Sequence, residues 1–172
     1  MTRLATFAPA LMLLTAGCGY HIAGRGDLLP KTMKTVAIQP FGNNTMLYKL
    51  ARLLPADVGH ELISRTKYQL VDDPSHADAV LTGNLINYGA YPTVIDPITS
   101  RATTVQVITT VQFTLTERAT GKVLVTRPGF EVRERYEISG DPKAYFDESG
   151  TAMERVSKDV ARTIISAILE NF

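Results

Sequence analysis

The chain has 172 residues, of which 45% are apolar, and these values suit one domain with a buried core rather than two domains. Its 18 Lys and Arg residues against 17 Asp and Glu residues give a net charge of +1. This balance excludes the dense positive field that non-specific nucleic-acid binding needs. An aromatic content of 8%, with no Trp, offers few surfaces on which bases could stack. We therefore expect no nucleic-acid partner.

Residues 1–17 have the three parts of a secretory signal peptide. Arg3 gives a positive start, residues 4–14 are mainly apolar, and the small residues 15–17 precede the single cysteine, Cys18. The apolar stretch is too short to cross a bilayer, which takes about 20 apolar residues, and no later segment comes close. We predict that residues 1–17 are removed and that the mature chain has no transmembrane helix.

A cysteine directly after such a segment resembles the start of a mature bacterial lipoprotein, although Thr15 stands where that pattern prefers Leu. The resemblance implies a diacylglycerol and an N-acyl chain on Cys18. The alternative is an exported protein with a free thiol, which would be a liability in an oxidising compartment. Several acyl chains anchor a protein stably to a membrane. Because Gly19, rather than Asp, follows the cysteine, we expect the periplasmic side of the outer membrane.

Residues 18–33 are rich in Gly and contain Pro30 without any apolar periodicity, so we expect a lipidated tether. Residues 34–172 are expected to form a single α+β periplasmic domain. Arg3 is the only charged residue of the signal segment, so the mature chain keeps 17 basic and 17 acidic side chains. A charged partner must therefore be bound by a local cluster and not by the overall field.

The first half of this domain predicts a strand, a helix and two further strands. Residues 34–40 form a short apolar strand that is closed by turn chemistry at residues 41–44. An apolar stripe with a period of four then indicates a helix; it consists of Leu50, Leu54, Val58 and Leu62. Because Pro55 interrupts the stripe, we place the helix from Pro55 to about Thr66 and leave residues 47–54 open as a kinked first part.

Strands follow at residues 68–71 and from Ala79 to about Tyr88, separated by a loop. A strand, a helix and a strand in succession predict a right-handed crossover with parallel pairing. Residues 89–101 contain two prolines, Pro92 and Pro97, and are expected to form a long loop that orders on a partner.

Residues 102–116 carry the clearest pattern in the sequence, because apolar and polar side chains alternate with only Ile108 and Thr109 out of place. This pattern predicts a strand with one buried face and one wet, Thr- and Gln-rich face. A turn at Thr120-Gly121 leads to a return strand at residues 122–136. The apolar positions change parity across Pro128-Gly129, which predicts a β-bulge there.

The C-terminal segment predicts a long amphipathic helix from about Ser149, after a capped turn at Asp141-Pro142 and a break at Gly150. Its apolar residues recur at helical spacing; they are Met153, Val156, Val160, Ile164, Ile168 and Phe172. The predicted fold is therefore an α+β two-layer sandwich, with a mixed sheet of four or five strands and two helices on one face.

The sequence contains no pattern that favours catalysis. His21, His60 and His76 lie far apart, and His60-Glu61 lacks the second histidine of a zinc-binding helix. No glycine-rich phosphate loop with a lysine and no nucleophilic serine elbow is present. We expect no catalytic residue, no metal and no cofactor apart from the lipid on Cys18.

The predicted topology gathers basic residues at one end of the sheet. If residues 79–88, 102–116 and 122–136 form an antiparallel meander, that end holds Arg101, Arg133, Arg135 and Lys143. Such a cluster could bind anionic phosphates. The alternative is a solvated surface whose basic groups are neutralised by nearby carboxylates, namely Glu131, Glu134, Asp141 and Asp147.

Several segments resemble the LptE family of lipopolysaccharide-assembly lipoproteins. The resemblance spans the mature chain in the same order of elements, although Pro55 within the first helix departs from it. The matching segments are Cys18-Gly19-Tyr20-His21, Gly24-Arg25-Gly26, Leu29-Pro30, Lys34 to Ile38, Phe41 to Thr45, Ala77 to Gly83 and Gly121 to Leu124.

This resemblance implies a non-enzymatic lipoprotein that sits as a plug in the outer-membrane barrel LptD, helps that barrel assemble and assists the insertion of lipopolysaccharide into the outer leaflet. A Thr- and Gln-rich sheet face would suit a polar barrel lumen. By loop position, the resemblance implies lipopolysaccharide contacts for Arg101 and Lys143.

A second resemblance leads to a different function. Residues 36–38, followed by Phe41 and residues 43–45, also resemble periplasmic regulatory or secretion-accessory lipoproteins, which bind a cell-envelope synthase or self-assemble.

Overall fold

The computed structural model describes residues 33–137 and the backbone of residues 142–170, with side chains from Gly150 onward in that last segment. The predicted signal peptide, Cys18 and nearly all of the predicted tether lie outside the described residues. Met33, the last tether residue, is only 6% exposed. Met33, which we placed in the tether, is part of the hydrophobic core.

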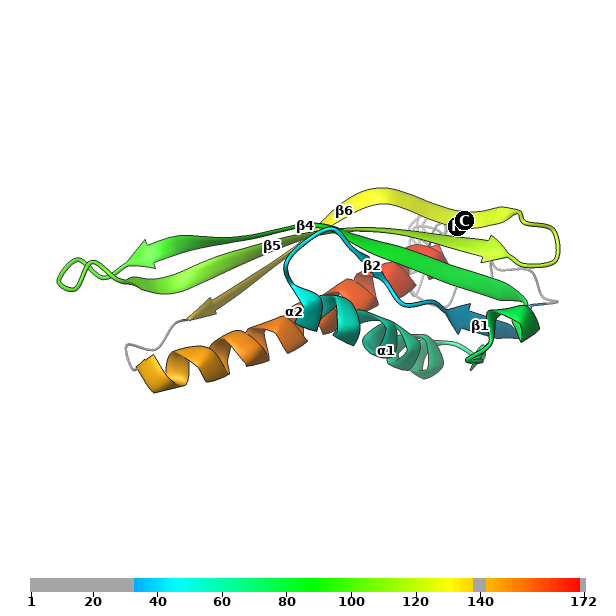
Figure 1. The fold of residues 1–172 in the computed structure, drawn as a ribbon, viewed down its shortest axis with the longest axis horizontal. Coiled ribbons are helices and arrows are strands. Elements are labelled where there is room, and N and C mark those ends of the chain that lie inside the picture. The colour runs from blue at the N-terminus through cyan, green and yellow to red at the C-terminus, as the bar shows by residue number, and fades with distance from the viewer. Residues whose placement is uncertain (1–32, 138–141, 171–172) are drawn as a thin grey trace, which may run out of the picture.

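The domain is a mixed sheet covered on one face by two helices (Figure 1). In chain order the elements are β1 (Thr35–Ile38), β2 (Gly42–Asn43), α1 (Tyr48–Arg65), β3 (Gln69–Leu70), the 3-10 helix η2 (Pro74–His76), β4 (Ala79–Ile95), β5 (Ala102–Glu117), β6 (Val123–Glu137) and α2 (Pro142–Glu170). The strand order is β3-β1-β4-β5-β6, and β2 also pairs with β4. The predicted α+β class, two-layer architecture and helix placement are confirmed.

The sheet contains both parallel and antiparallel strand pairs, as the sequence predicted. β1 pairs in parallel with β3 and β4, across the α1 crossover. β4, β5 and β6 form an antiparallel meander. The sheet has six strands rather than four or five, because Gly42 and Asn43, which we predicted as a turn, pair with Asn84 and Leu85 of β4.

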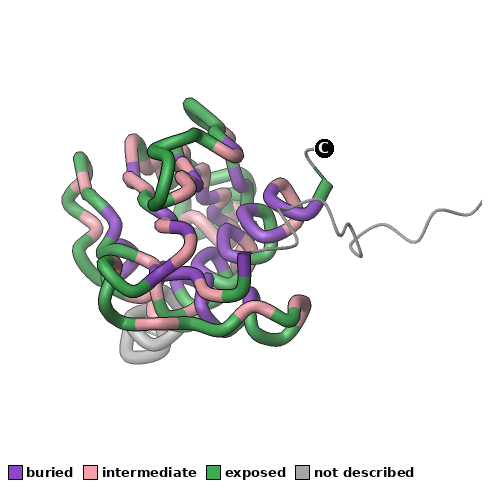
Figure 2. Tube along the Cα trace, turned by 90° about the vertical axis from the view of Figure 1, so that its right-hand side faces the viewer, coloured by how far each residue is buried: buried purple, intermediate pink, exposed green. Residues whose placement is uncertain are grey.

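The core lies between the inner sheet face and the two helices, and Figure 2 shows the buried positions gathered in the middle of the molecule. The inner face of β5 is buried along its length, and Phe113 meets Phe130 of β6 edge-to-face, with ring centroids 5.9 Å apart. Each fully buried aliphatic side chain contributes about 1.5–3 kcal/mol. The buried faces of α1 and α2 cover this core on the side opposite the sheet.

The predicted β-bulge at Pro128-Gly129 is confirmed. Val111 of β5 pairs with Phe130, whereas Phe113, two residues further on, pairs with Arg127, three residues back. The extra residue therefore lies in β6 between Arg127 and Phe130. It shifts the side-chain alternation by one, which is the parity change seen in the sequence.

Helix α1 begins at Tyr48, seven residues before the predicted start, and Pro55 lies inside it. An internal proline costs about 3 kcal/mol because it removes a hydrogen bond and crowds the preceding turn. Leu50 and Leu54, on the N-terminal side of Pro55, are fully buried. Their burial offsets that cost, so the stripe continues through the proline.

Helix α2 begins at Pro142 and continues through Gly150, where we predicted a break. A glycine inside a helix costs only about 1 kcal/mol relative to alanine. The side chain of Lys49 in α1 reaches this position, since a Cβ on Gly150 would lie 3.2 Å from its Nζ.

The predicted long loop at residues 89–101 is wrong, because β4 continues to Ile95 and only residues 96–101 form the turn. Pro92 pairs with Val105 within the strand. A proline is tolerated there because β1 ends beside Leu81 and β2 ends beside Leu85, so that β5 is the one described strand that pairs with β4 beyond Leu85. The result is a β4–β5 hairpin that projects past the start of α2 (Figure 1).

Candidate functional site

The sheet face away from the helices is polar. Cross-strand rows on it join threonines, amides and charged residues: Thr82, Thr114 and Thr126; Asn84 and Gln112; Asn87, Thr110 and Glu131; Tyr91, Gln106 and Arg135. The hydroxyl oxygens of Thr114 and Thr126 lie 3.0 Å apart, and the Thr82 hydroxyl donates to the carbonyl oxygen of Thr114 at 3.3 Å. We call these residues the polar face. Polar side chains therefore cover this face of the sheet.

Two of the predicted basic residues lie on this face. Arg133 is opposite Ile108 and Arg135 is opposite Gln106, so both point away from the helices. Arg133 forms an ion pair with Glu131, with 2.9 Å between Nη2 and Oε2, and both side chains are exposed. The neutralised-surface alternative therefore holds for Arg133. Among the described residues, Arg135 has no such partner.

Arg101 lies at the tip of the β4–β5 hairpin, just before the terminal pair of Ile95 and Ala102. At about 3.3 Å per residue, its backbone lies roughly 16 Å beyond that of Gln106, the neighbour of Arg135. The three arginines thus lie at one end of the sheet, as predicted, but along a line rather than in one cluster. Lys143 lies in the first turn of α2, and its side chain is outside the described residues.

The tip that carries Arg101 is held by Asp96. One carboxylate oxygen of Asp96 accepts hydrogen bonds from the backbone N–H of Ile98 at 2.7 Å and of Thr99 at 2.9 Å. The backbone N–H of Asp96 donates to the carbonyl oxygen of Arg101 at 2.8 Å. The N–H groups of Thr99 and Ile98 hold the pKa of Asp96 below its ordinary value. Arg101 is therefore presented on an ordered turn.

A second carboxylate, which the sequence reasoning did not single out, fixes the entry of the chain into the domain. Oδ2 of Asp78 accepts from the backbone N–H of Lys34 at 2.8 Å and of Thr35 at 2.9 Å. These bonds, and a third from the Thr35 hydroxyl, lower the pKa of Asp78. Nε of Arg118 donates to the carbonyl oxygen of Ala77 at 2.6 Å. The position of Asp78 just before β4 was visible in the sequence, but its partner 43 residues away was not.

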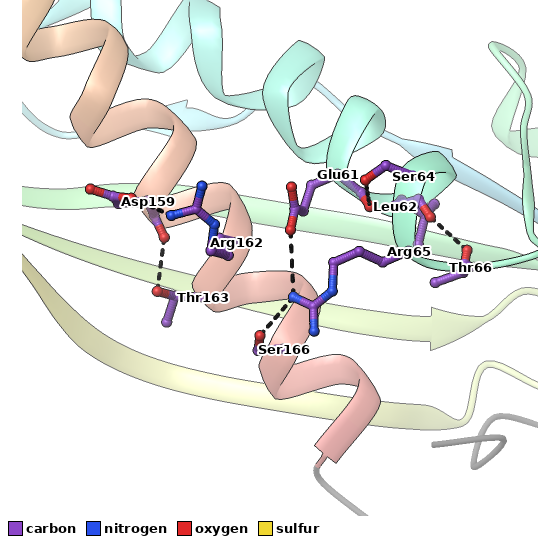
Figure 3. A network of polar contacts seen from close by, with 9 residues as sticks. All are labelled: Glu61, Leu62, Ser64, Arg65, Thr66, Asp159, Arg162, Thr163 and Ser166. Atoms are coloured by element: carbon purple, nitrogen blue, oxygen red, sulfur yellow. Dashed lines mark hydrogen bonds and ion pairs between the residues drawn. The ribbon is translucent and has the colours of Figure 1, made fainter. Parts of the chain in front are cut away.

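The two helices are joined by polar contacts as well as by the core. Nη1 of Arg65 lies 3.5 Å from Oε1 of Glu61 in the same helix and 2.8 Å from the hydroxyl of Ser166 in α2 (Figure 3). The fully buried hydroxyl of Ser157 in α2 donates to Asp57 in α1. These contacts help to fix how the two helices lie together.

Within residues 33–137 and 150–170, no three His, Cys, Asp or Glu side chains come together as metal ligands would. In the same part of the chain, neither helix is long and apolar enough to cross a membrane.

The comparison with protein families settles the relationship. The model of the lipopolysaccharide-assembly family LptE matches residues 33–168, which is most of the chain. This protein belongs to the LptE family. Comparison with the curated proteins gives no match.

Solved structures share the fold at low sequence identity. Lipoprotein B of Nitrosomonas europaea is 13% identical, with a TM-score of 0.57, and the match covers 89% of this chain and 92% of that protein. A Xanthomonas campestris protein is 12% identical, with a TM-score of 0.55 over 84% of this chain and 88% of that one. PelC of Paraburkholderia phytofirmans, described as a dodecamer, is 16% identical, with a TM-score of 0.51 over 84% and 94%. At these identities the likeness shows a shared fold and not a shared function.

Proposed function

We propose that this LptE-family chain is a non-enzymatic lipoprotein, anchored through lipid on Cys18 to the periplasmic side of the outer membrane. There it forms a plug in the LptD barrel, assists assembly of that barrel and helps lipopolysaccharide enter the outer leaflet. The family match over residues 33–168 carries this proposal. The polar face supports it, because the lumen of a large outer-membrane barrel is polar and a plug must present complementary groups to it.

Contacts with the phosphates of lipopolysaccharide are assigned to Arg101 and Lys143, with Arg135 as a neighbour on the polar face. Guanidinium groups suit phosphates because they donate two parallel hydrogen bonds. Arg101 and Arg135 have no carboxylate partner among the described residues, whereas Arg133 is paired with Glu131. Arg133 therefore contributes less than the other two arginines.

Depletion of the protein from its own cells tests this function. We expect less lipopolysaccharide at the cell surface and less correctly assembled LptD barrel, both restored by the wild-type gene. A Cys18→Ser variant tests the anchor, and we expect the part of this chain that is not bound to a barrel to leave the outer-membrane fraction. Normal surface lipopolysaccharide and normal barrel assembly after depletion would refute the proposal.

The alternative, a secretion-accessory or regulatory lipoprotein, has one observation in its favour: the shared fold with PelC. That role predicts self-assembly or a bound cell-envelope synthase in place of a barrel. Depletion would then leave surface lipopolysaccharide unchanged.

A further inference from the structure

The free end of the β4–β5 hairpin carries a group of exposed apolar side chains. Among the described residues, nine large apolar or aromatic side chains are exposed, and four of them lie within residues 91–98. Tyr91, Val94, Ile95 and Ile98 are 53%, 50%, 58% and 93% exposed. The hairpin projects past the start of α2 here, so neither helix covers it (Figure 1). We call residues 91–101 the hairpin end, and its apolar surface is of the kind that marks a binding site.

This part of the hairpin is also poor in charge. Between residues 86 and 110 the charged residues are Asp96 and Arg101 alone, although 20% of the chain is charged. Arg101 is exposed, and among the described residues it has no carboxylate partner. Aliphatic side chains beside a basic group are typical of segments that lie at the boundary between lipid phosphates and acyl chains.

The turn of the hairpin end, residues 96–100, uses its backbone N–H groups internally. The N–H of Asp96 donates to the carbonyl oxygen of Arg101 at 2.8 Å, and that of Ser100 donates to the carbonyl oxygen of Asp96 at 2.9 Å. The N–H groups of residues 98 and 99 donate to the Asp96 carboxylate. The remaining residue of the turn is a proline, which has no N–H. The turn therefore needs no partner for its backbone donors.

Two threonine hydroxyls next to the turn are satisfied in the same way. The Thr93 hydroxyl donates to the carbonyl oxygen of Thr104 at 3.4 Å, and the Thr103 hydroxyl donates to that of Val94 at 3.3 Å. An acyl-chain layer offers no hydrogen-bond partners, so a segment that enters it must satisfy its own donors. A polypeptide partner sets no such condition, and protein interfaces draw their energy from Trp, Tyr and Arg more than from Val. The hairpin end therefore suits a lipid better than a polypeptide.

We propose that the hairpin end binds the acyl chains of lipopolysaccharide, through Val94, Ile95 and Ile98, while Arg101 lies at the level of the phosphates. An arginine side chain is long enough to keep its charge among the phosphates while its apolar neighbours lie deeper. This inference goes beyond the proposed function, which assigns contacts with phosphates alone. It rests on that function for the identity of the lipid.

A fluorophore at position 98 that responds to polarity tests the acyl-chain contact. The mature chain with Cys18→Ser and Ile98→Cys has a single thiol for labelling, because Cys18 is the only cysteine of the sequence. It also lacks the predicted lipid site, so the assay contains no detergent. We expect the emission to shift to shorter wavelength with lipopolysaccharide and to stay unchanged with deacylated lipopolysaccharide that keeps its phosphates.

The other outcomes of this experiment each overturn a stated part of the account. An equal shift with deacylated lipopolysaccharide would overturn the acyl-chain contact. An equal shift with phosphatidylglycerol vesicles would overturn lipopolysaccharide as the lipid in favour of a bilayer surface. A shift with the LptD barrel alone would overturn the inference, because a polypeptide would then cover the hairpin end. Lipopolysaccharide binding without a shift would overturn the inference and leave the proposed function intact, whereas no binding at all would contradict that function.

A matched pair of variants provides a second measurement. Ile98→Ser removes an apolar side chain and should raise the Kd for lipopolysaccharide at least about fivefold, without changing the Kd for the deacylated form. Met46→Ser is the control, because Met46 is 91% exposed before the start of α1 and away from the hairpin. The control should change the Kd less than about twofold, since it removes no contact with the lipid. Thermal melts report whether both variants are folded, and equal Kd values for two folded variants would contradict the proposal.

Discussion

Asp78 and Thr35 are joined by hydrogen bonds in both directions, although 43 residues separate them. Oδ2 of Asp78 accepts from the N–H of Thr35 at 2.9 Å and from its hydroxyl at 3.0 Å. The N–H of Asp78 lies 2.9 Å from the same hydroxyl oxygen. The contact ties the start of β1 to the start of β4. It fixes the point at which the predicted lipid tether enters the folded domain.

Asp78→Asn should lower the free energy of unfolding by about 1 kcal/mol, because the amide accepts these hydrogen bonds less strongly than a carboxylate does. The effect is small because the carboxylate is close to solvent. Urea denaturation measures it, with Asp72→Asn on the exposed loop as the control. Equal midpoints for the two variants would show that the hydrogen bonds of Asp78 do not stabilise the fold.

The same carboxylate should make stability depend on pH. Its pKa is lower in the folded chain than the ordinary value of about 3.9, so its contribution is fully present above that value. The contribution is lost as the pH falls through the folded-state pKa. Asp73 and Asp96 share this behaviour, so Asp78→Asn should reduce, and not abolish, the loss of stability in acid. An acid titration of the unfolding midpoint that is identical for wild type and variant would contradict the assignment.

Thr109→Val should stabilise the protein by about 1 kcal/mol. Thr109 is fully buried on the inner face of β5, and its hydroxyl has no hydrogen-bond partner among the described residues. Replacing it with a methyl group of the same shape removes the cost of burying an unsatisfied polar group. Thr110→Val, on the polar face, is the control and should change stability little. A thermal melt in which Thr109→Val is the less stable of the two would refute this reading of the core.

Gly83→Ala should destabilise the fold by about 1–3 kcal/mol, since a Cβ there would overlap the ring of Phe41, which is itself buried. Gly129→Ala is the matched control, because its nearest neighbour would lie 3.8 Å away. Adding Phe41→Leu to Gly83→Ala should restore part of the lost stability. If the double variant loses as much unfolding free energy as the two single variants lose together, the two residues do not compete for that space.

Arg101→Glu together with Lys143→Glu should raise the Kd for lipopolysaccharide at least about tenfold, or about 1.4 kcal/mol. The fold should be retained, because Arg101 lies at an exposed hairpin tip. Arg155→Glu with Lys158→Glu changes the charge equally on the exposed face of α2 and should have little effect. Unchanged binding by the folded double variant, at fixed ionic strength, would refute the role of the hairpin end.

The elements that could be predicted from the sequence are those with a local signal. The alternation in β5 and the change of parity at Pro128-Gly129 identified the meander and its bulge, because strand periodicity is two. The lengths of α1 and β4 could not be predicted, since Pro55 and Pro92 are tolerated only through tertiary context. In α1 that context is the burial of Leu50 and Leu54, and in β4 it is the missing neighbour beyond Leu85.

The candidate site could be predicted only in part, because its geometry also depends on tertiary context. Chain order alone places Arg101 and Arg135 at one end of a meander, but only the register shows that roughly 16 Å of strand separates them. The ion pair between Arg133 and Glu131 and the hydrogen bonds of Asp78 could not be predicted, because they depend on side-chain contacts that the sequence periodicity does not show.

Purification of the lipidated protein from outer membranes in mild detergent tests the central claim most directly. Mass spectrometry would identify the co-purifying proteins, and their amounts would give the stoichiometry. The plug function predicts one copy of the LptD barrel for each copy of this chain. Recovery of a cell-envelope synthase, or of an oligomer of this chain alone, would contradict it and favour the regulatory or secretion role.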